Sequence, residues 1–250
     1  MLIETLSVFP EMFEPVMSTS ILGRARKAGL FDFNSYNLRD WTHDRHRTVD
    51  DEPYGGGQGM LMKVEPLTEA VQAISSEGPR PTTVFFTPCG RRFDQHVAEE
   101  LVLCERLLFV CGRYEGMDER AYDMADYRLS IGDYILTGGE LPAMVVADAV
   151  VRLIPGALGD SMSNVDESFS TASDGGLLEY AQYTRPAEFN GNAVPDVLLS
   201  GDHAKVDAWR RKNAIERTCR WRPDLIEQAH LTDEERAYAQ SLIDGCEECL

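Results

Sequence analysis

The sequence has no hydrophobic run long enough to cross a membrane. The nearest candidate, Ala143 to Val151, is interrupted by Asp148, whereas a membrane-spanning helix needs about 20 predominantly apolar residues. The chain opens with strand-like residues and lacks the basic segment that begins a secretory signal peptide. With 43% hydrophobic and 26% charged residues, the 250-residue chain is typical of a globular protein. These features predict a cytoplasmic protein with no membrane partner.

Cysteines are too few and too scattered for a disulfide scaffold. The chain has six of them. Cys104 and Cys111 lie in apolar contexts, where we expect core thiols. Cys246 and Cys249 have the spacing of a zinc or redox pair, but no second pair or histidine cluster accompanies them. A terminal helix explains this pair better, and the sequence predicts no metal site.

Basic residues are also in short supply, with 24 Lys and Arg against 42 Asp and Glu and a net charge of −18. This balance argues against a nucleic-acid partner, because phosphate binding depends on cations. The distribution is uneven, however. Residues 203–222 hold seven basic and two acidic side chains, and residues 227–250 hold one basic and seven acidic. The basic segment predicts either a nucleic-acid surface or an ordinary solvated helix face.

Strand-like and helical patterns alternate along the first two thirds of the chain. We expect strands over residues 2–9, 30–36, 82–86, 107–111 and 127–131, and helices over 10–13, 20–28, 66–75, 94–103 and 140–154. This alternation predicts a parallel α/β sheet that binds ligands beyond the carboxyl ends of its strands. Residues 39–62 form a long loop rich in glycine and charge, and loops of that length are usually functional.

An acidic stretch separates this region from a helical C-terminal module. Residues 157–181 contain five acidic and no basic side chains, with abundant Ser and Gly, which is typical of a linker. Beyond the linker, we expect Trp209, Ile215 and Trp221 to supply the core of the module.

Three glycine-containing turns follow predicted strands, at residues 87–90, 111–116 and 130–144. Glycine lets the backbone approach a ligand closely, and Pro142 in a first helical turn costs no hydrogen bond. A pocket for an adenine or ribose edge and a set of tight strand-to-helix turns both fit this pattern. None of the turns has the dinucleotide or P-loop spacing. The glycine-rich segment 54–60 lacks the lysine of a P-loop, so we expect a flap there and no nucleotidase.

Taken together, the motifs resemble the bacterial tRNA (guanine-N1)-methyltransferase (TrmD) family over essentially the whole chain. The segments that carry the resemblance are 42–47 with 50–57, 110–116, 130–144, and 183–186 with 198–203. The resemblance implies a SPOUT-type α/β fold, with a parallel sheet, helices on both faces and a C-terminal trefoil knot, followed by a small all-α C-terminal domain.

The same resemblance divides the chain into three parts. It implies a knotted S-adenosylmethionine-binding methyltransferase domain over 1–159, a mobile acidic linker over 160–176 and a helical tRNA-binding domain over 177–250. It also implies a homodimer with active sites at the subunit interface, and tRNA, through its anticodon stem-loop, as the partner.

The implied reaction transfers a methyl group from S-adenosyl-L-methionine to N1 of the guanine at tRNA position 37. Guanine N1 carries a proton, so a general base is required, and negative charge develops on O6 as that proton leaves. The resemblance assigns the O6 contact to Arg152 and the base to the carboxylate before Ser168. The family places Asp there, whereas this chain has Asp166 and Glu167. Spacing favours Glu167, with Asp166 as the alternative.

The changed carboxylate leaves a second hypothesis open, a catalytically silent RNA-binding homologue that keeps the cofactor pocket. A requirement for Mg²⁺ is also open, because no dedicated site is evident. The resemblance implies that the cofactor contacts are Thr87, Pro88, Gly90, Gly112, Tyr114, Glu115, Gly116, Ile131, Gly132, Asp133, Tyr134, Ile135, Leu136, Gly138, Gly139 and Pro142. The implied substrate contacts are Asp50, Gly55, Gly56, Gly57, Gly59, His43, Arg45, His46, Arg47, His203, Arg210, Arg211 and Lys212.

Overall fold

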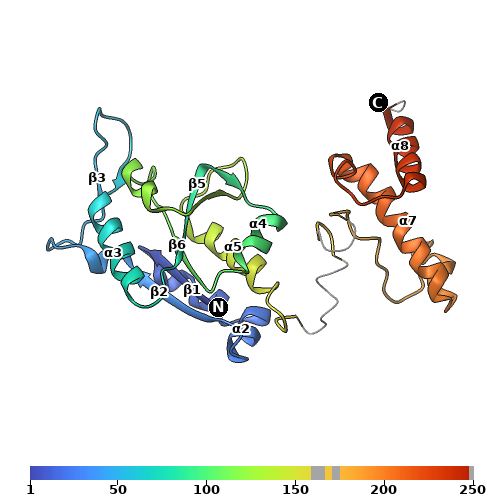
Figure 1. Ribbon diagram of the computed structural model, residues 1–250, viewed down its shortest axis with the longest axis horizontal. Coiled ribbons are helices and arrows are strands. Elements are labelled where there is room, and N and C mark those ends of the chain that lie inside the picture. Colours follow the sequence, from blue (N-terminus) through green and yellow to red (C-terminus); the bar gives the residue numbers. More distant parts are fainter. Residues whose placement is uncertain (159–166, 171–174, 248–250) are drawn as a thin grey trace. The chain divides into compact units, whose positions relative to one another are not determined.

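The computed structural model describes residues 1–158, 167–170 and 175–247 and contains two compact units, Met1–Ser161 and Met162–Leu250 (Figure 1). The division falls inside the predicted linker, whose mobility and role remain predictions. Each unit has its own core. Across the described residues, no helix is long and apolar enough to cross a membrane.

A five-stranded parallel sheet forms the centre of the first unit, with the strand order β2-β1-β6-β5-β7. Its strands are β1 (Leu2–Ser7), β2 (Asp32–Asn37), β5 (Thr82–Arg92), β6 (Arg106–Val110) and β7 (Tyr127–Ser130). The prediction of a parallel α/β sheet is therefore confirmed. A separate two-stranded ladder, β3 (Asp50–Asp51) with β4 (Leu61–Met62), closes the base of the glycine-rich flap.

Helices cover both faces of the sheet (Figure 1). Residues of α1 (Glu14–Met17), α2 (Ser20–Lys27), α4 (Gln95–Leu101) and α5 (Glu140–Val151) share one apolar cluster, and those of α3 (Val64–Ser76) and the 3-10 helices η2 (Leu38–Trp41) and η3 (Glu119–Met124) share the other. A third 3-10 turn, η1 (Pro10–Met12), precedes α1. Alternate residues of β6 point into the two clusters, Leu107 and Phe109 into one and Leu108 and Val110 into the other. This is the two-residue period of a strand buried on both sides.

Strand β5 runs beyond its predicted end at Phe86. Both Phe86 and Arg91 pair with Leu129 of β7, so residues 87–90 form a bulge within the strand rather than a turn into a helix. A Cβ atom on Gly90 would lie 2.5 Å from the backbone nitrogen of Leu129. Gly90 therefore lets β5 rejoin β7, a contact between distant segments that the local sequence did not reveal.

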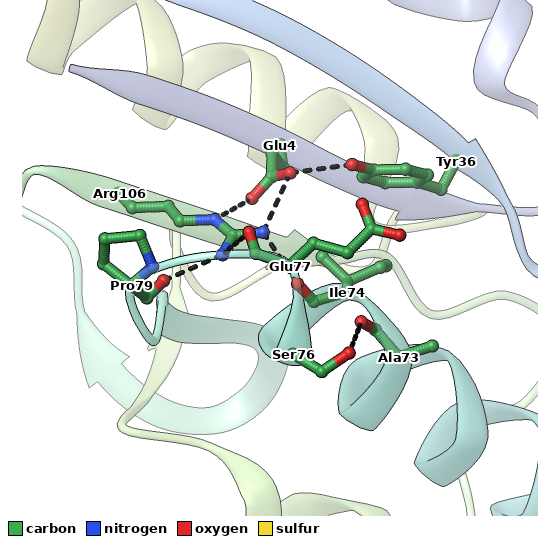
Figure 2. Close-up of polar contacts among 8 residues, drawn as sticks. All are labelled: Glu4, Tyr36, Ala73, Ile74, Ser76, Glu77, Pro79 and Arg106. Carbon is green, nitrogen blue, oxygen red and sulfur yellow. Dashed lines mark hydrogen bonds and ion pairs between the residues drawn. The ribbon is translucent and has the colours of Figure 1, made fainter.

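A buried ionic network lies at the amino end of β6, where Arg106 lies beside Glu4 of β1 (Figure 2). Arg106 Nε donates to Glu4 Oε2 at 2.6 Å, and Tyr36 Oη donates to Glu4 Oε1 at 2.8 Å. The two terminal nitrogens of the same guanidinium donate to Glu4 Oε1 and to the carbonyls of Ile74, Glu77 and Pro79. All five N–H donors of the guanidinium are thereby used. Burial, then Glu4, raises the pKa of Tyr36 to about 12.

We predict that Arg106→Met destabilises the first unit by about 3–5 kcal/mol, because the Glu4 carboxylate would remain buried without its partner. The control is Arg26→Met, which removes a half-exposed pair with Glu14 and should cost under about 1 kcal/mol. Urea unfolding is followed by Trp41 fluorescence with Trp209 and Trp221 replaced by Phe. Equal losses in the two variants would contradict the role given to the network.

The second unit contains α6 (Asp196–Leu199), α7 (His203–Trp221), the 3-10 turn η4 (Pro223–Leu225) and α8 (Asp233–Glu247). It is not all-α as predicted, because β8 (Glu188–Phe189) and β9 (Asn192–Ala193) form a small hairpin. Asn190 and Gly191, which join these strands, have positive φ angles of 51° and 78°. Asn-Gly is a strong local signal for such a two-residue turn, but no hairpin was predicted from it.

The core of the second unit contains only one of its three predicted large residues. Ile215 is buried, Trp209 is half-buried with its ring 6.4 Å from that of Tyr183, and Trp221 is 62% exposed. Trp221 lies one heptad after the buried Ala214, so the helical period predicts a buried position. Helix α7 ends at Trp221, however, and the chain turns away through η4. The prediction for Trp221 is wrong because the apolar stripe extends past the end of the packed core.

Helix α8 begins with a capping box that also receives an arginine from α7. The backbone N–H of Glu235 donates to Thr232 Oγ1, and that of Thr232 donates to Glu235 Oε2. Arg211 Nε donates to Glu235 Oε1 at 2.8 Å, and its Nη2 donates to the carbonyl of His230. The hydrogen bond from Arg211 is the main reason that the pKa of Glu235 is lowered to about 2. This contact joins the two long helices.

We predict that Glu235→Gln weakens the second unit above pH 4.5 and that the difference from the parent disappears as the pH falls to about 2. A carboxylate with a lowered pKa stabilises the fold above its unfolded pKa and loses that contribution as it becomes protonated. Unfolding by urea is followed at Trp209 and Trp221 with Trp41 replaced by Phe. Glu234→Gln is the control, since Glu234 is exposed in the same turn. A difference that persists unchanged at pH 2 would contradict the assignment.

Candidate active site

A cavity of about 480 Å³ opens at the carboxyl ends of β5, β6 and β7, where ligands of parallel sheets are expected. Three chain segments form its wall: the β5 bulge, the loop after β6, and the loop from β7 into α5. These are the glycine-containing segments singled out in the sequence. They come together in one place, as the pocket interpretation of the glycine pattern predicted.

All but two of the predicted cofactor residues line this cavity. The exceptions are Gly90, which serves the β5–β7 contact, and Asp133, which is exposed. Several further residues line the cavity without having been predicted from the sequence: Phe86, Arg113, Met117, Glu119, Tyr122, Leu129 and Ser130. Arg113 and Ser130 lie inside the quoted motifs. Tyr122 belongs to η3, a helical turn that the sequence pattern did not reveal.

Two of the loops cross at backbone contact. The N–H of Gly139 donates to the carbonyl of Gly112 at 2.8 Å, and Gly138 forms an antiparallel bridge with Arg113. A Cβ atom on Gly139 would lie 2.9 Å from both Cys111 Cα and Gly112 N. Only glycine fits there without moving a backbone. Because residue 139 has no side chain, the two loops can touch and form one continuous wall of the cavity.

A buried carboxylate fixes this crossing from behind. Glu140, the first residue of α5, is 1% exposed and accepts a hydrogen bond of 2.6 Å from Ser7 Oγ at the end of β1. Its Oε2 lies 2.9 Å from Nε of Arg113, whose guanidinium carbon lies 4.6 Å from the centre of the Phe9 ring. A negative charge at a helix N-terminus is also favourable. Glu140 thus joins β1, α5 and the loop after β6.

The thiol of Cys111, next to this pair, is buried and protonated. Cys111 is fully buried beside this pair, and burial, followed by the charge of Glu140, raises the pKa of its thiol well above the usual value. This agrees with the prediction of a core thiol. Cys104 is only partly buried.

The predicted substrate flap is tied to the loop after β6. The N–H of Glu115 donates to the carbonyl of Met60 at 3.0 Å, and a Cβ atom on Gly59 would lie 2.3 Å from Glu115 Cγ. Gly55, Gly56, Gly57 and Gly59 all have positive φ angles, which glycine adopts readily. The flap also lines a second hollow, formed by Glu52, Pro53, Gly56, Gly57, Gly59 and Met60. The flap and the cavity wall therefore share a boundary.

Tyr114 lies at that boundary with a strained backbone. Its φ angle of +60° is uncommon for a residue with a side chain, and such strain often marks functional sites. Burial, then the carboxylate of Asp50, raises the pKa of its phenol. Tyr114, predicted as a cofactor contact, and Asp50, predicted as a substrate contact, are thus neighbours.

Comparison with known proteins identifies the family of the chain. A family model described as tRNA (Guanine-1)-methyltransferase TrmD matches residues 1–228. The chain belongs to this family. A Brevibacillus brevis protein named tRNA (guanine-N(1)-)-methyltransferase is 54% identical over 235 residues, which cover 94% of this chain and 95% of that protein. A protein of the same name from Geobacter sulfurreducens is 52% identical over 234 residues, which cover 93% of this chain and 94% of that protein.

Membership of the TrmD family implies S-adenosylmethionine as the methyl donor. The residues implied for the chemistry belong to different units. Arg152 is the half-buried C-cap of α5 in the first unit, and Glu167 is half-buried in the second. Asp166 lies outside the described residues. Across the described residues, no group of three or more His, Cys, Asp or Glu side chains could hold a metal ion.

The segment after Glu167 is fastened within the second unit. Ser168 Oγ accepts from the N–H of Glu179 at 2.9 Å, and the N–H of Phe169 donates to the carbonyl of Leu177 at 3.1 Å. The chain after Leu177 in turn runs along α7 through hydrogen bonds with side chains of Thr218, Asn213 and Arg217. The backbone that bears Glu167 is thus joined to α7.

The predicted phosphate contacts differ in their surroundings. His43 pairs with Glu69 at 2.7 Å, Arg47 pairs with Asp40, and Arg45 and His46 are exposed. In the second unit His203 is exposed, Arg210 lies over Tyr180, and Lys212 lies over Tyr238. Arg211 has the structural role at Glu235 described above, which the sequence pattern did not indicate.

We predict that Gly139→Ala weakens S-adenosylmethionine binding at least about 10-fold and destabilises the first unit by about 1–3 kcal/mol, because the added methyl group forces the crossing backbones apart. Calorimetric titration with the cofactor measures the first effect and urea unfolding the second. Gly245→Ala is the control, since a Cβ atom there meets nothing within 4 Å. If Gly139→Ala bound the cofactor as tightly as the parent, the crossing would not be what shapes the site.

Proposed function

We propose that the protein transfers a methyl group from S-adenosyl-L-methionine to N1 of the guanine at position 37 of tRNA, next to the anticodon. The observation that carries the proposal is one cavity lined by three separate loops, which contains all but two of the residues that the family resemblance implies for the cofactor. The names of the relatives support the same reaction and substrate.

The residues around the cavity fit the cofactor. Its volume lies within the range of about 300–1,000 Å³ for small-molecule sites. Apolar side chains such as Phe86, Leu129 and Pro142 suit an adenine ring, and the glycine-rich loops offer backbone N–H and C=O groups to its polar edge. The bound sulfonium would supply an activated methyl group. The protein's task is then to hold the guanine N1 in line with it.

The remaining chemistry needs a base and a cation. We assign the base to Glu167, whose carboxylate would take the proton from N1, with Asp166 as the alternative. The guanidinium of Arg152 would donate to O6 and stabilise the charge that develops there. A glutamate has one more methylene than the family's aspartate and a similar intrinsic pKa, so the chemistry is preserved.

The geometry of α5 supports a dimeric active site. The N-terminus of α5 closes the cavity and Arg152 caps its other end, so a 12-residue helix of roughly 18 Å separates them. An antiparallel partner helix would bring the partner subunit's Arg152 towards the cavity. Ile135, Leu141 and Val145 near and along α5 are exposed apolar residues, as expected for a surface covered in a homodimer.

We further propose the SPOUT trefoil knot for the loops around the cavity, which are in backbone contact at Gly112 and Gly139. Such knots are very rare. We assign tRNA binding to the second unit, which contains the basic helix α7, and the role of a linker to residues 160–176. A tRNA substrate also favours a cytoplasmic location. A Mg²⁺ requirement is tested by adding a chelator to the methylation assay.

We predict that the parent methylates a tRNA transcript with guanines at positions 36 and 37 and does not methylate one with adenine at 37. Glu167→Gln should lower the single-turnover rate at saturating cofactor and tRNA by about 100-fold or more, as expected for loss of a general base. Asp166→Asn should have a much smaller effect.

Three results would redirect the assignment. An unimpaired Glu167→Gln together with an impaired Asp166→Asn would move the base to Asp166. Two unimpaired variants would remove the base from this segment. Cofactor binding by the parent without any methylated product would favour the silent RNA-binding homologue.

A further inference from the structure

The C-terminal end of α7 carries a large exposed aromatic side chain among cations. Trp221 is 62% exposed, and it stands between Arg220 and Arg222 in the sequence. The guanidinium carbon of Arg220 lies 4.8 Å from the centre of the indole ring. Residues buried elsewhere account for the core of this unit, so the indole is not needed to close it. The fold leaves this aromatic surface available.

The arginines alone have a simple structural explanation, because cations near a helix C-terminus are favourable. That explanation does not extend to the indole, because an apolar ring left in water forgoes the free energy that its burial would provide. An exposed apolar ring could also cover another protein surface, but the residues beside it are cationic and exposed. Unpaired RNA bases stack on aromatic rings and on arginine guanidinium planes, while their phosphates pair with cations. Ring and charge together fit a nucleotide.

A second aromatic contact connects this end of α7 with the segment that bears Glu167. The guanidinium carbon of Arg222 lies 5.7 Å from the centre of the Phe169 ring, and Arg222 is held in place by a paired contact with Asp224. Phe169 is itself 41% exposed and has a φ angle of +69°. It lies two residues after Glu167. A nucleotide at the end of α7 would therefore be near the segment of the proposed base.

We infer that Trp221 and Arg220 form a stacking site for an unpaired nucleotide of the anticodon loop. The inference rests on the proposed function, since it takes tRNA as the ligand. It adds a nucleotide-binding site to the general electrostatic attraction of α7. Its nearness to Phe169 favours a nucleotide close to the guanine that is methylated.

The experiment compares tRNA affinity and methylation in Trp221 variants of the full-length protein. Removing one base–aromatic stack should weaken tRNA binding by about 5- to 150-fold, so Trp221→Ala is expected in that range and Trp221→Phe closer to the parent. Trp221→Leu keeps an apolar side chain without an aromatic face and should resemble Trp221→Ala. Phe189→Ala removes another exposed aromatic residue of the same unit, 67% exposed, and should leave affinity within about twofold.

Fluorescence tests the contact directly. The chain has three tryptophans, so replacing Trp41 and Trp209 by Phe leaves Trp221 as the one that remains. An anticodon stem-loop RNA should quench its fluorescence. Placing an abasic nucleotide at each loop position in turn identifies the stacked base. At that position, the abasic change and Trp221→Ala should not add, because each removes the same contact.

The outcomes separate this inference from the proposed function. If the parent neither binds nor methylates tRNA, the proposed function fails. If the parent methylates tRNA while Trp221→Ala binds it as tightly as the parent, only the stacking site is overturned. Fluorescence that responds to protein concentration but not to RNA would place the indole in a contact between copies and would also overturn it.

Discussion

The site depends on the backbone contact between Gly139 and Gly112. Two loops that are distant in the sequence can form one wall only if their main chains touch, and a side chain at 139 would collide with Cys111 and Gly112. Glu140 stabilises the contact through Ser7 and Arg113. Because this one carboxylate contacts both a strand end and a loop, it connects β1, α5 and the cavity wall.

The Arg106 network and the cavity lie in different parts of the first unit. The Arg106–Glu4–Tyr36 network lies at the amino end of β6 and connects three strands with the C-terminus of α3. The cavity lies beyond the carboxyl ends. Among the described residues, the hydrogen-bond partners of Arg106 are Glu4, Ile74, Glu77 and Pro79, and none of these lines the cavity. Substitution of Arg106 is therefore expected to lower stability alone, whereas Gly139→Ala lowers both stability and cofactor affinity.

Sequence patterns predicted the sheet and the glycine loops well, because both follow from local chemistry. Alternating strands and helices lead to a parallel sheet, and glycine after a strand predicts a close backbone approach. The failures involve contacts between distant segments. Gly90 faces β7, and Arg211 reaches the cap of α8. Trp221 kept the helical period although the helix ended there. The residues next to Trp221 in the sequence do not show where the segments that pack against α7 end. The Asn190–Gly191 turn was a local signal that was overlooked.

The hydrogen bonds of Ser168 and Phe169 hold the segment of the proposed base inside the second unit. The cavity belongs to the first unit and the proposed base to the second. Under the proposed function, the first unit would bind the cofactor and the second would supply the base. If α7 also binds the tRNA, the base and the substrate-binding surface belong to the same unit. Substrate recognition and proton abstraction would then be linked through one folded unit, separately from cofactor binding.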